Sequence, residues 1–89
     1  MTTITVRQAT PEELAHCQTW SLWESGDTDR FAYQYDQDVQ FVVQRGEAAI
    51  HSQGNAPVTI APGRHVTIRK GVDAIWAIRA AVVNRYQYL

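Results

Sequence analysis

Three acidic residues in the middle of the chain, Asp36, Asp38 and Glu47, are candidates for general acid–base chemistry. That chemistry needs a carboxylate held in a cavity that shifts its pKa. Asp36 and Asp38 flank a single residue in a turn-like Asp-Gln-Asp stretch, where carboxylates usually cap their own backbone in solvent. We therefore expect a solvated turn here and no catalytic pair.

The three histidines and the single cysteine are candidates for metal binding or nucleophilic chemistry. His65 precedes the apolar positions of the run 66–68, so strand alternation predicts that it points outward to solvent. His51 is likewise out of phase with its apolar neighbours. His16 and Cys17 adjoin each other on a predicted helix, where neighbours do not face one another. We expect Cys17 to act as a small hydrophobe.

One capped helix and a series of short strands must position these residues. Residues 10–13, Thr-Pro-Glu-Glu, form a capping box with proline at the first helical position, which predicts a short helix ending near Cys17. After it, β-branched and aromatic residues alternate with polar ones in short runs between turn signals, which indicates an all-β sandwich or barrel. The predicted strands cover residues 31–35, 39–44, 48–50, 58–60, 66–68, 74–78 and 82–88.

Length and charge limit the class of protein. The 89 residues suffice for one domain with a thin stability margin, which oligomerisation often supplements. The formal net charge is −1 and no run of Lys or Arg forms a stripe, so we expect no nucleic-acid partner. No apolar stretch approaches the ~20 residues that cross a bilayer, so we expect no membrane partner. The N-terminus has no signal-peptide pattern, and a cytoplasmic location is expected.

Several short motifs follow one another in a specific order. They are Trp20 and Trp23, the aromatic stretch Phe31 to Asp36, the Gly46-Glu47 turn, Pro62-Gly63 before the run 66–68, Lys70-Gly71, Trp76, and Arg85-Tyr86. In this order and spacing, residues 20–88 resemble a small single-domain cupin-like family of unknown function, related to ethanolamine-utilisation and ureidoglycine-aminohydrolase cupins. The resemblance implies an all-β cupin double-stranded β-helix, a jelly-roll barrel with one short N-terminal helix. Residues 1–89 would then form a single cupin domain, with a strand and the helix in 1–19 and the barrel in 20–89.

The resemblance also locates the positions that hold a metal in other cupins. With Gly46 as the turn glycine of the first motif, a His pair is expected within 32–35 and a Glu at Val39. In the second motif, which starts at Gly63, the His or Cys position is Ala74. No His stands within 32–35, and valine and alanine supply none of the donors that a divalent metal needs. We therefore expect no metal and no other cofactor.

On the same resemblance, a set of mostly aromatic side chains should line the barrel. The expected pocket residues are Tyr33, Tyr35, Val39, Phe41, Ala74, Trp76 and Tyr86. Apolar walls with a few phenol and indole donors suit a small polar metabolite. The same side chains can instead form a filled core, because the interior of so small a barrel is just wide enough for side chains.

Three functions stay open at this stage. The chain is expected to be a metal-independent barrel that binds a small molecule, an enzyme acting on small nitrogenous or sugar compounds, or a structural or assembly protein. No catalytic residue can be assigned, and the balance is against catalysis. A homodimer is expected in each case, because small barrels often pair through exposed strand edges.

Overall fold

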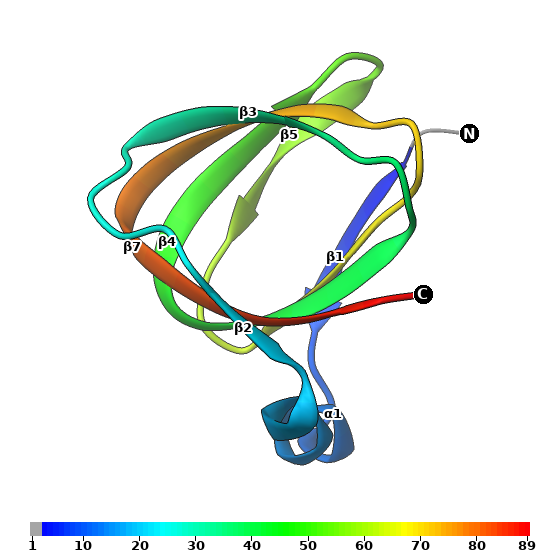
Figure 1. The fold of residues 1–89 in the computed structure, drawn as a ribbon, viewed down its shortest axis with the longest axis vertical. Helices are drawn as coiled ribbons and strands as arrows, with labels where there is room; N and C mark the ends of the chain where they lie inside the picture. The colour runs from blue at the N-terminus through cyan, green and yellow to red at the C-terminus, as the bar shows by residue number, and fades with distance from the viewer. Residues whose placement is uncertain (1–2) are drawn as a thin grey trace.

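Two long strands, β4 and β7, run through the whole molecule and organise the shorter ones (Figure 1). The structure is a computed structural model that describes residues 3–89, so residues 1–2 of the expected domain lie outside the described part. Its elements are β1 (Ile4–Gln8), α1 (Pro11–His16), the 3-10 turn η1 (Cys17–Thr19), β2 (Ser21–Glu24), β3 (Arg30–Gln34), β4 (Val39–Ser52), β5 (Asn55–Ile60), β6 (Arg64–Ile68) and β7 (Asp73–Tyr88).

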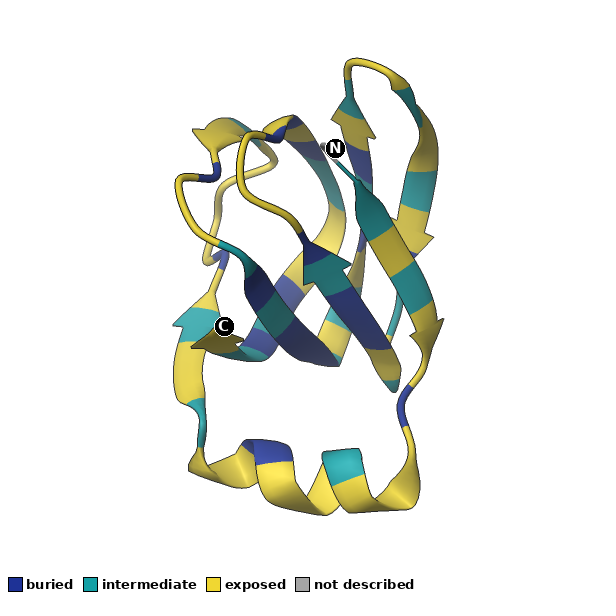
Figure 2. Ribbon diagram, turned by 90° about the vertical axis from the view of Figure 1, so that its right-hand side faces the viewer, coloured by how far each residue is buried: buried dark blue, intermediate teal, exposed yellow. Residues whose placement is uncertain are grey.

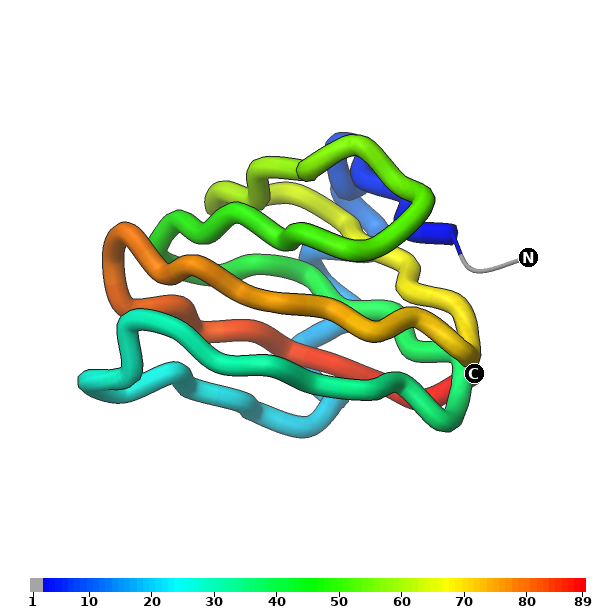
Figure 3. Tube along the Cα trace, turned by 90° about the horizontal axis from the view of Figure 1, so that it is seen from above, coloured from blue at the N-terminus to red at the C-terminus, as the bar shows by residue number. Residues whose placement is uncertain are grey.

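The strands β4 and β7 pair antiparallel from Val39 opposite Tyr88 to Ser52 opposite Ala74. The first half of β4 also pairs with β6 and its second half with β5. The first half of β7 pairs with β3 and its second half with β2, while β1 adds to the far side of β6. Seen from above in Figure 3, β3, the start of β7 and the end of β4 lie side by side. The sheet curls around one interior, which confirms the predicted all-β jelly roll with one short helix.

Gly46 allows β4 to bend where the sheet turns. The β4–β7 register shifts between Val43 and Ala48, so the ladder is interrupted at the bend. Gly46 has a φ of +87°, a region that favours glycine, and a Cβ there would lie 2.1 Å from the carbonyl oxygen of Ala81. The strands can therefore approach at this point only because no side chain is present.

Alternation along the strands carries apolar side chains into the interior. Val39, Phe41 and Val43, which alternate along β4 and so share one face of the strand, are all buried. On β7, Ala74, Trp76, Val82 and Asn84 are buried as well. The core therefore lies between the two halves of the curled sheet.

The helix α1 covers one end of the barrel (Figure 2). Its capping box forms as predicted, because the Glu13 amide donates to Thr10 Oγ1 at 3.1 Å and the Thr10 amide donates to Glu13 Oε1 at 2.9 Å. Cys17 is fully buried next to Ala9 and Val42, the place of a small hydrophobe. No helix within residues 3–89 has the length and apolarity that a membrane span requires.

His65 is buried, and the prediction that it points to solvent is wrong. Its side chain is 5% exposed, and its Nε2 lies 3.0 Å from Gln40 Oε1 and 3.6 Å from Glu13 Oε2. Gln40 donates its own amide to Gln87 at 3.1 Å, so the Gln40 oxygen faces His65 and the imidazole donates from Nε2. Alternation did place His65 on the outer face of its strand, but the N-terminal segment covers that face.

We expected the Asp38 carboxylate to cap its own turn in the Asp-Gln-Asp stretch, but it binds groups in another loop instead. Its carboxylate accepts the Lys70 amide at 2.7 Å and the Arg69 guanidinium at 3.3 Å. These bonds lower the pKa of Asp38, the Lys70 amide most of all. The loop before β4 is thereby joined to the loop between β6 and β7.

Gly46→Ala is expected to lower the unfolding free energy by about 3 kcal/mol or more, because the new Cβ overlaps the Ala81 carbonyl and the positive φ adds strain. Urea unfolding measures the loss. Gly54→Ala is the matched control, because Gly54 has a similar φ of +82° but no atom within 4 Å of the added Cβ. The control should lose only about 1 kcal/mol. Equal losses in the two variants would contradict the close approach at Gly46.

Acid is expected to weaken the attachment of α1 in a defined pH window. The hydrogen bonds from Arg7, at 2.7 Å, and from the Thr10 amide lower the pKa of Glu13 from 4.5 to about 2. A lowered folded-state pKa stabilises the fold above pH 4.5, and this contribution is lost as the pH falls from 4.5 towards 2. Burial also lowers the pKa of His65, which adds a loss that starts below pH 6.5.

Glu13→Gln should therefore flatten the dependence of the urea midpoint on pH between 4.5 and 2, and cost about 1 kcal/mol or less at neutral pH, because the ion pair is partly exposed. Glu12→Gln removes the neighbouring exposed carboxylate of the same turn and is the control. If the urea midpoint of Glu13→Gln fell between pH 4.5 and 2 as steeply as that of the parent, Glu13 would not be the group that causes the acid destabilisation.

Candidate functional site

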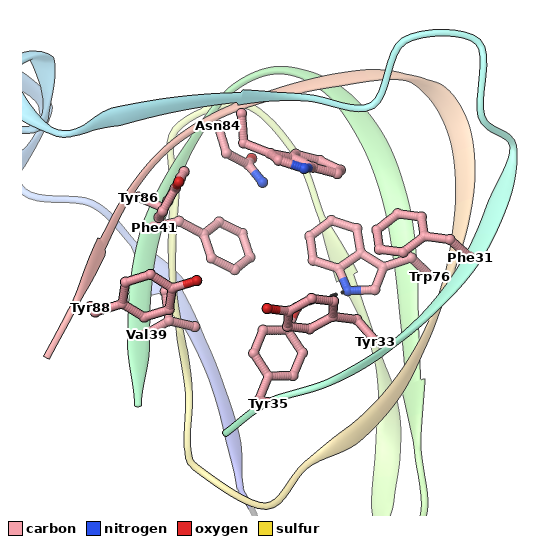
Figure 4. A pocket seen from close by; sticks show the side chains of 10 residues that line it. Phe31, Tyr33, Tyr35, Val39, Phe41, Trp76, Asn84, Tyr86 and Tyr88 are labelled. Atoms are coloured by element: carbon pink, nitrogen blue, oxygen red, sulfur yellow. Dashed lines mark hydrogen bonds between the residues drawn. The ribbon is translucent and has the colours of Figure 1, made fainter. Parts of the chain in front are cut away.

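A cavity of about 150 Å³ lies inside the barrel between β2, β3, β4 and β7 (Figure 4). Ten side chains line it: Trp23, Phe31, Tyr33, Tyr35, Val39, Phe41, Trp76, Asn84, Tyr86 and Tyr88. They include all four tyrosines, both phenylalanines and two of the three tryptophans of the chain. Almost the whole aromatic content of the protein is thus gathered around one small space.

Six of the seven side chains expected to line a pocket surround this cavity. The exception is Ala74, which instead lines a more open hollow of about 530 Å³ together with His51, Ser52 and others. Ala74 shares the inward face of β7 with Trp76 and pairs with Tyr33 of β3, but its methyl group does not reach the cavity. That the six residues bind a ligand stays a prediction.

Four lining residues were missed by the sequence reasoning. Phe31 stands two positions before Tyr33, and Asn84 and Tyr88 stand two positions either side of Tyr86, so the period-two rule extended along the same strands finds all three. Trp23 comes from β2, at the edge of the sheet. Its place depends on how β2 pairs with β7, which a local pattern does not specify.

Trp76 is the centre of the aromatic wall. Its ring stacks on Phe31 at a centroid distance of 5.4 Å and lies 5.6 Å from Trp23 and 5.7 Å from Phe41. Such tilted and offset pairs add to the free energy of apolar burial. The indole Nε1–H donates to the Tyr35 hydroxyl at 3.2 Å. The position of Trp76 is therefore fixed by both packing and a buried hydrogen bond.

Tyr35 is a neutral phenol in this environment. It is 9% exposed, and burial raises the pKa of its hydroxyl to about 12, more than the bond from Trp76 lowers it. At physiological pH its hydroxyl proton stays in place and can be donated to another acceptor. Tyr35 is therefore suited to hydrogen bonding and not to removing a proton.

Two pairs of tyrosines stand near the mouth of the cavity (Figure 4). The rings of Tyr33 and Tyr35 meet edge to face at 4.7 Å, and those of Tyr86 and Tyr88 do so at 5.7 Å. Tyr33 and Tyr88 are each nearly half exposed, so they mark the boundary with solvent. Interaction with the Tyr33 hydroxyl raises the pKa of Tyr88.

Asn84 is the most unusual polar group at the site. Its side chain is 3% exposed and extends into the cavity (Figure 4), and within residues 3–89 its Oδ1 has no hydrogen-bond partner. Leaving a buried acceptor unsatisfied costs about 1–3 kcal/mol. Buried polar groups in proteins usually have a hydrogen-bond partner, such as a protein group, an ordered water or a ligand.

The site does not fit a metal of the kind that other cupins hold. Within the described residues 3–89, no three His, Cys, Asp or Glu side chains come together. Tyr33 and Tyr35 lie in the stretch where the histidine pair is expected, and Val39 takes the Glu position. The polar groups around the cavity are phenols, indoles and one carboxamide, which do not form the imidazole, thiolate or carboxylate sets that bind divalent metals.

The family model for the EutQ-like cupin domain matches residues 12–86. No curated protein matches the chain. Among solved structures, a DUF861 family protein from Thermotoga maritima has a TM-score of 0.89 at 22% sequence identity, with 98% of this chain and 100% of that chain covered.

Two further solved structures belong to longer chains. The EutQ protein of Clostridium difficile has a TM-score of 0.61 at 17% identity, over 98% of this chain and 68% of that one. A Ralstonia eutropha protein, provisionally assigned as a mannose-6-phosphate isomerase, has a TM-score of 0.55 at 20% identity, over 96% and 67%. At these identities the likenesses establish the fold alone. Because the family model spans most of the sequence, the chain belongs to the EutQ-like cupin domain family.

Proposed function

We propose that this protein is a metal-independent cupin that binds a small polar metabolite inside its barrel. The observation that carries the proposal is the buried carboxamide of Asn84, which extends into an aromatic cavity with its Oδ1 unpartnered. A cavity of about 150 Å³ is the size that accepts a benzene-like molecule of about six non-hydrogen atoms.

A binding pocket accounts for the cavity better than a filled core does. A core needs no hydroxyl groups, yet four phenols and a carboxamide surround this space. Apolar walls with a few convergent polar groups are the usual composition of a small-molecule site. These groups support a pocket over the filled core that the sequence also allowed.

Binding is also favoured over catalysis. None of the ten lining residues is Asp, Glu, His, Cys, Lys or Arg, so the cavity has no side chain that exchanges protons readily near neutral pH. Tyr35, the most enclosed phenol, has its pKa raised to about 12. The absence of a basic lining residue also removes the usual partner of a phosphate, so sugar-phosphate isomerisation, the provisional activity of one similar protein, has no anchor here.

We further propose that the protein is a homodimer in the cytoplasm. Within residues 3–89, the strand β1 pairs only with β6 and β2 only with β7, so the outer edges of both are available for pairing with a second copy. Sedimentation velocity at micromolar concentration is expected to give a mass near twice 10.1 kDa. A single species of 10.1 kDa at that concentration would contradict the dimer.

A thermal-shift screen of small uncharged and positively charged metabolites tests the binding function. A ligand at ~100 times its Kd adds about 2.7 kcal/mol, which raises the Tm of so small a domain by about 10 °C or more. The shift is expected to be the same in EDTA as with added divalent metal. A response that appears only with metal, or no response to any compound, would refute the proposal.

Asn84→Leu makes this test sharper. Leucine has a similar volume and no unsatisfied acceptor, so the ligand-free variant is expected to be as stable as the parent or about 1 kcal/mol more stable. The shift caused by a ligand should nevertheless disappear. Ile75→Ala, an exposed change on the same strand, should leave the shift intact. If Asn84→Leu kept the ligand-induced rise in Tm, Asn84 would be excluded from the binding site.

A further inference from the structure

The charges around the cavity favour a ligand of one sign. No lining residue carries a positive charge, so an anion that entered would lose its water without gaining a cationic partner. Eight of the ten lining residues are aromatic, and the faces of aromatic rings are negative. The interior therefore offers a favourable environment to a cation and an unfavourable one to an anion.

The mouth adds to this bias. Asp36 lies close enough to Tyr88 that its charge contributes to raising the pKa of that phenol. Asp38, in contrast, is engaged by the Lys70 amide and by Arg69, which is itself neutralised in the pair. Asp36 thus places a carboxylate near the phenol of Tyr88, apart from the Asp38–Arg69 pair.

Asn84 supplies a deeply placed carboxamide, in addition to the hydroxyl of the buried Tyr35. The Asn84 amide nitrogen lies nearer the middle of the cavity (Figure 4), whereas Oδ1 is buried without a partner within residues 3–89. A half-turn of the last side-chain bond exchanges the two atoms and presents the oxygen to a ligand. An N–H group, or the polarised methyl group of an alkylammonium ion, satisfies that oxygen. A purely hydrocarbon ligand would leave it unsatisfied.

We propose that the ligand is a small organic ammonium ion of about six or seven non-hydrogen atoms, held by the rings of Trp23, Phe41 and Trp76 and by the Asn84 carboxamide. A polar tail on such an ion extends towards the hydroxyls of Tyr33 and Tyr88 at the mouth. This inference rests on the proposed small-molecule function and specifies its ligand class.

A pair of compounds of equal shape isolates the charge. Choline and 3,3-dimethylbutan-1-ol differ in that a quaternary nitrogen replaces a quaternary carbon. Calorimetric titration of the intact protein is expected to give a Kd for choline at least tenfold lower than that for the alcohol. Equal affinities for the two compounds would overturn the ammonium inference and leave the small-molecule function standing. Binding of acetate or inorganic phosphate in preference to choline would overturn it as well.

Trp23→Leu tests the aromatic contribution, and it is expected to reduce the ratio of the two affinities while the neutral alcohol still binds. Leu22→Ala, an exposed change on the same strand, is the control. Should Trp23→Leu fail to fold, Asp36→Asn gives an independent test at the surface. It is expected to weaken choline binding at low ionic strength and to leave the alcohol unaffected. Asp27→Asn, which removes an exposed carboxylate in the β2–β3 loop, is the control and should change neither the affinity for choline nor that for the alcohol.

Unchanged choline affinity in both Trp23→Leu and Asp36→Asn would overturn the inference. If neither compound binds but an uncharged metabolite raises the Tm, the ligand class is wrong and the pocket is real. If no compound of any charge binds, the proposed function and the ligand class fail together.

Discussion

The antiparallel pairing of β4 with β7 determines nearly everything else in this molecule. Both strands belong to both halves of the curled sheet, and their shared ladder passes through a bend at Gly46. Trp76 lies on one side of that bend and Asn84 on the other, yet both reach the same cavity. A glycine that permits close backbone contact therefore sets the geometry of a pocket in which it takes no part.

Much of this arrangement follows from rules that act along single strands. The alternation of Tyr33 and Tyr35, and of Val39 and Phe41, together with the family resemblance, predicted that these four side chains face the interior, and all four line the cavity. The capping box was also predictable, because Thr10 and Glu13 are three residues apart and bond to each other's backbone amides in that turn. Where neighbours in sequence decide the environment of a residue, the sequence analysis was sufficient.

The parts that could not be predicted depend on segments far apart in the chain. His65 is on the outer face of its strand, as alternation requires, but that face is covered by an N-terminal segment some fifty residues earlier. Asp38 takes its hydrogen bond from Lys70, in another loop. Trp23 reaches the cavity through the pairing of β2 with the end of β7. Burial and pairing of this kind are properties of the assembled barrel, and no local pattern encodes them.

The pairing of strands that are far apart in the sequence slows the folding of the chain. Within residues 3–89, β4–β5 is the one ladder between strands adjacent in sequence, whereas Val39 must find Tyr88 and Ile4 must find Ile68. The entropy cost of closing such long loops precedes the favourable contacts that the closed loops make. Chains dominated by distant pairings therefore fold in milliseconds to seconds. The β4–β5 hairpin closes the shortest loop of these ladders, and its paired part, residues 48–60, contains none of the ten cavity residues, although Val39 and Phe41 at the start of β4 do line the cavity. Four lining residues, Trp76, Asn84, Tyr86 and Tyr88, lie on the final strand, so a nascent chain has no complete cavity until β7 is in place.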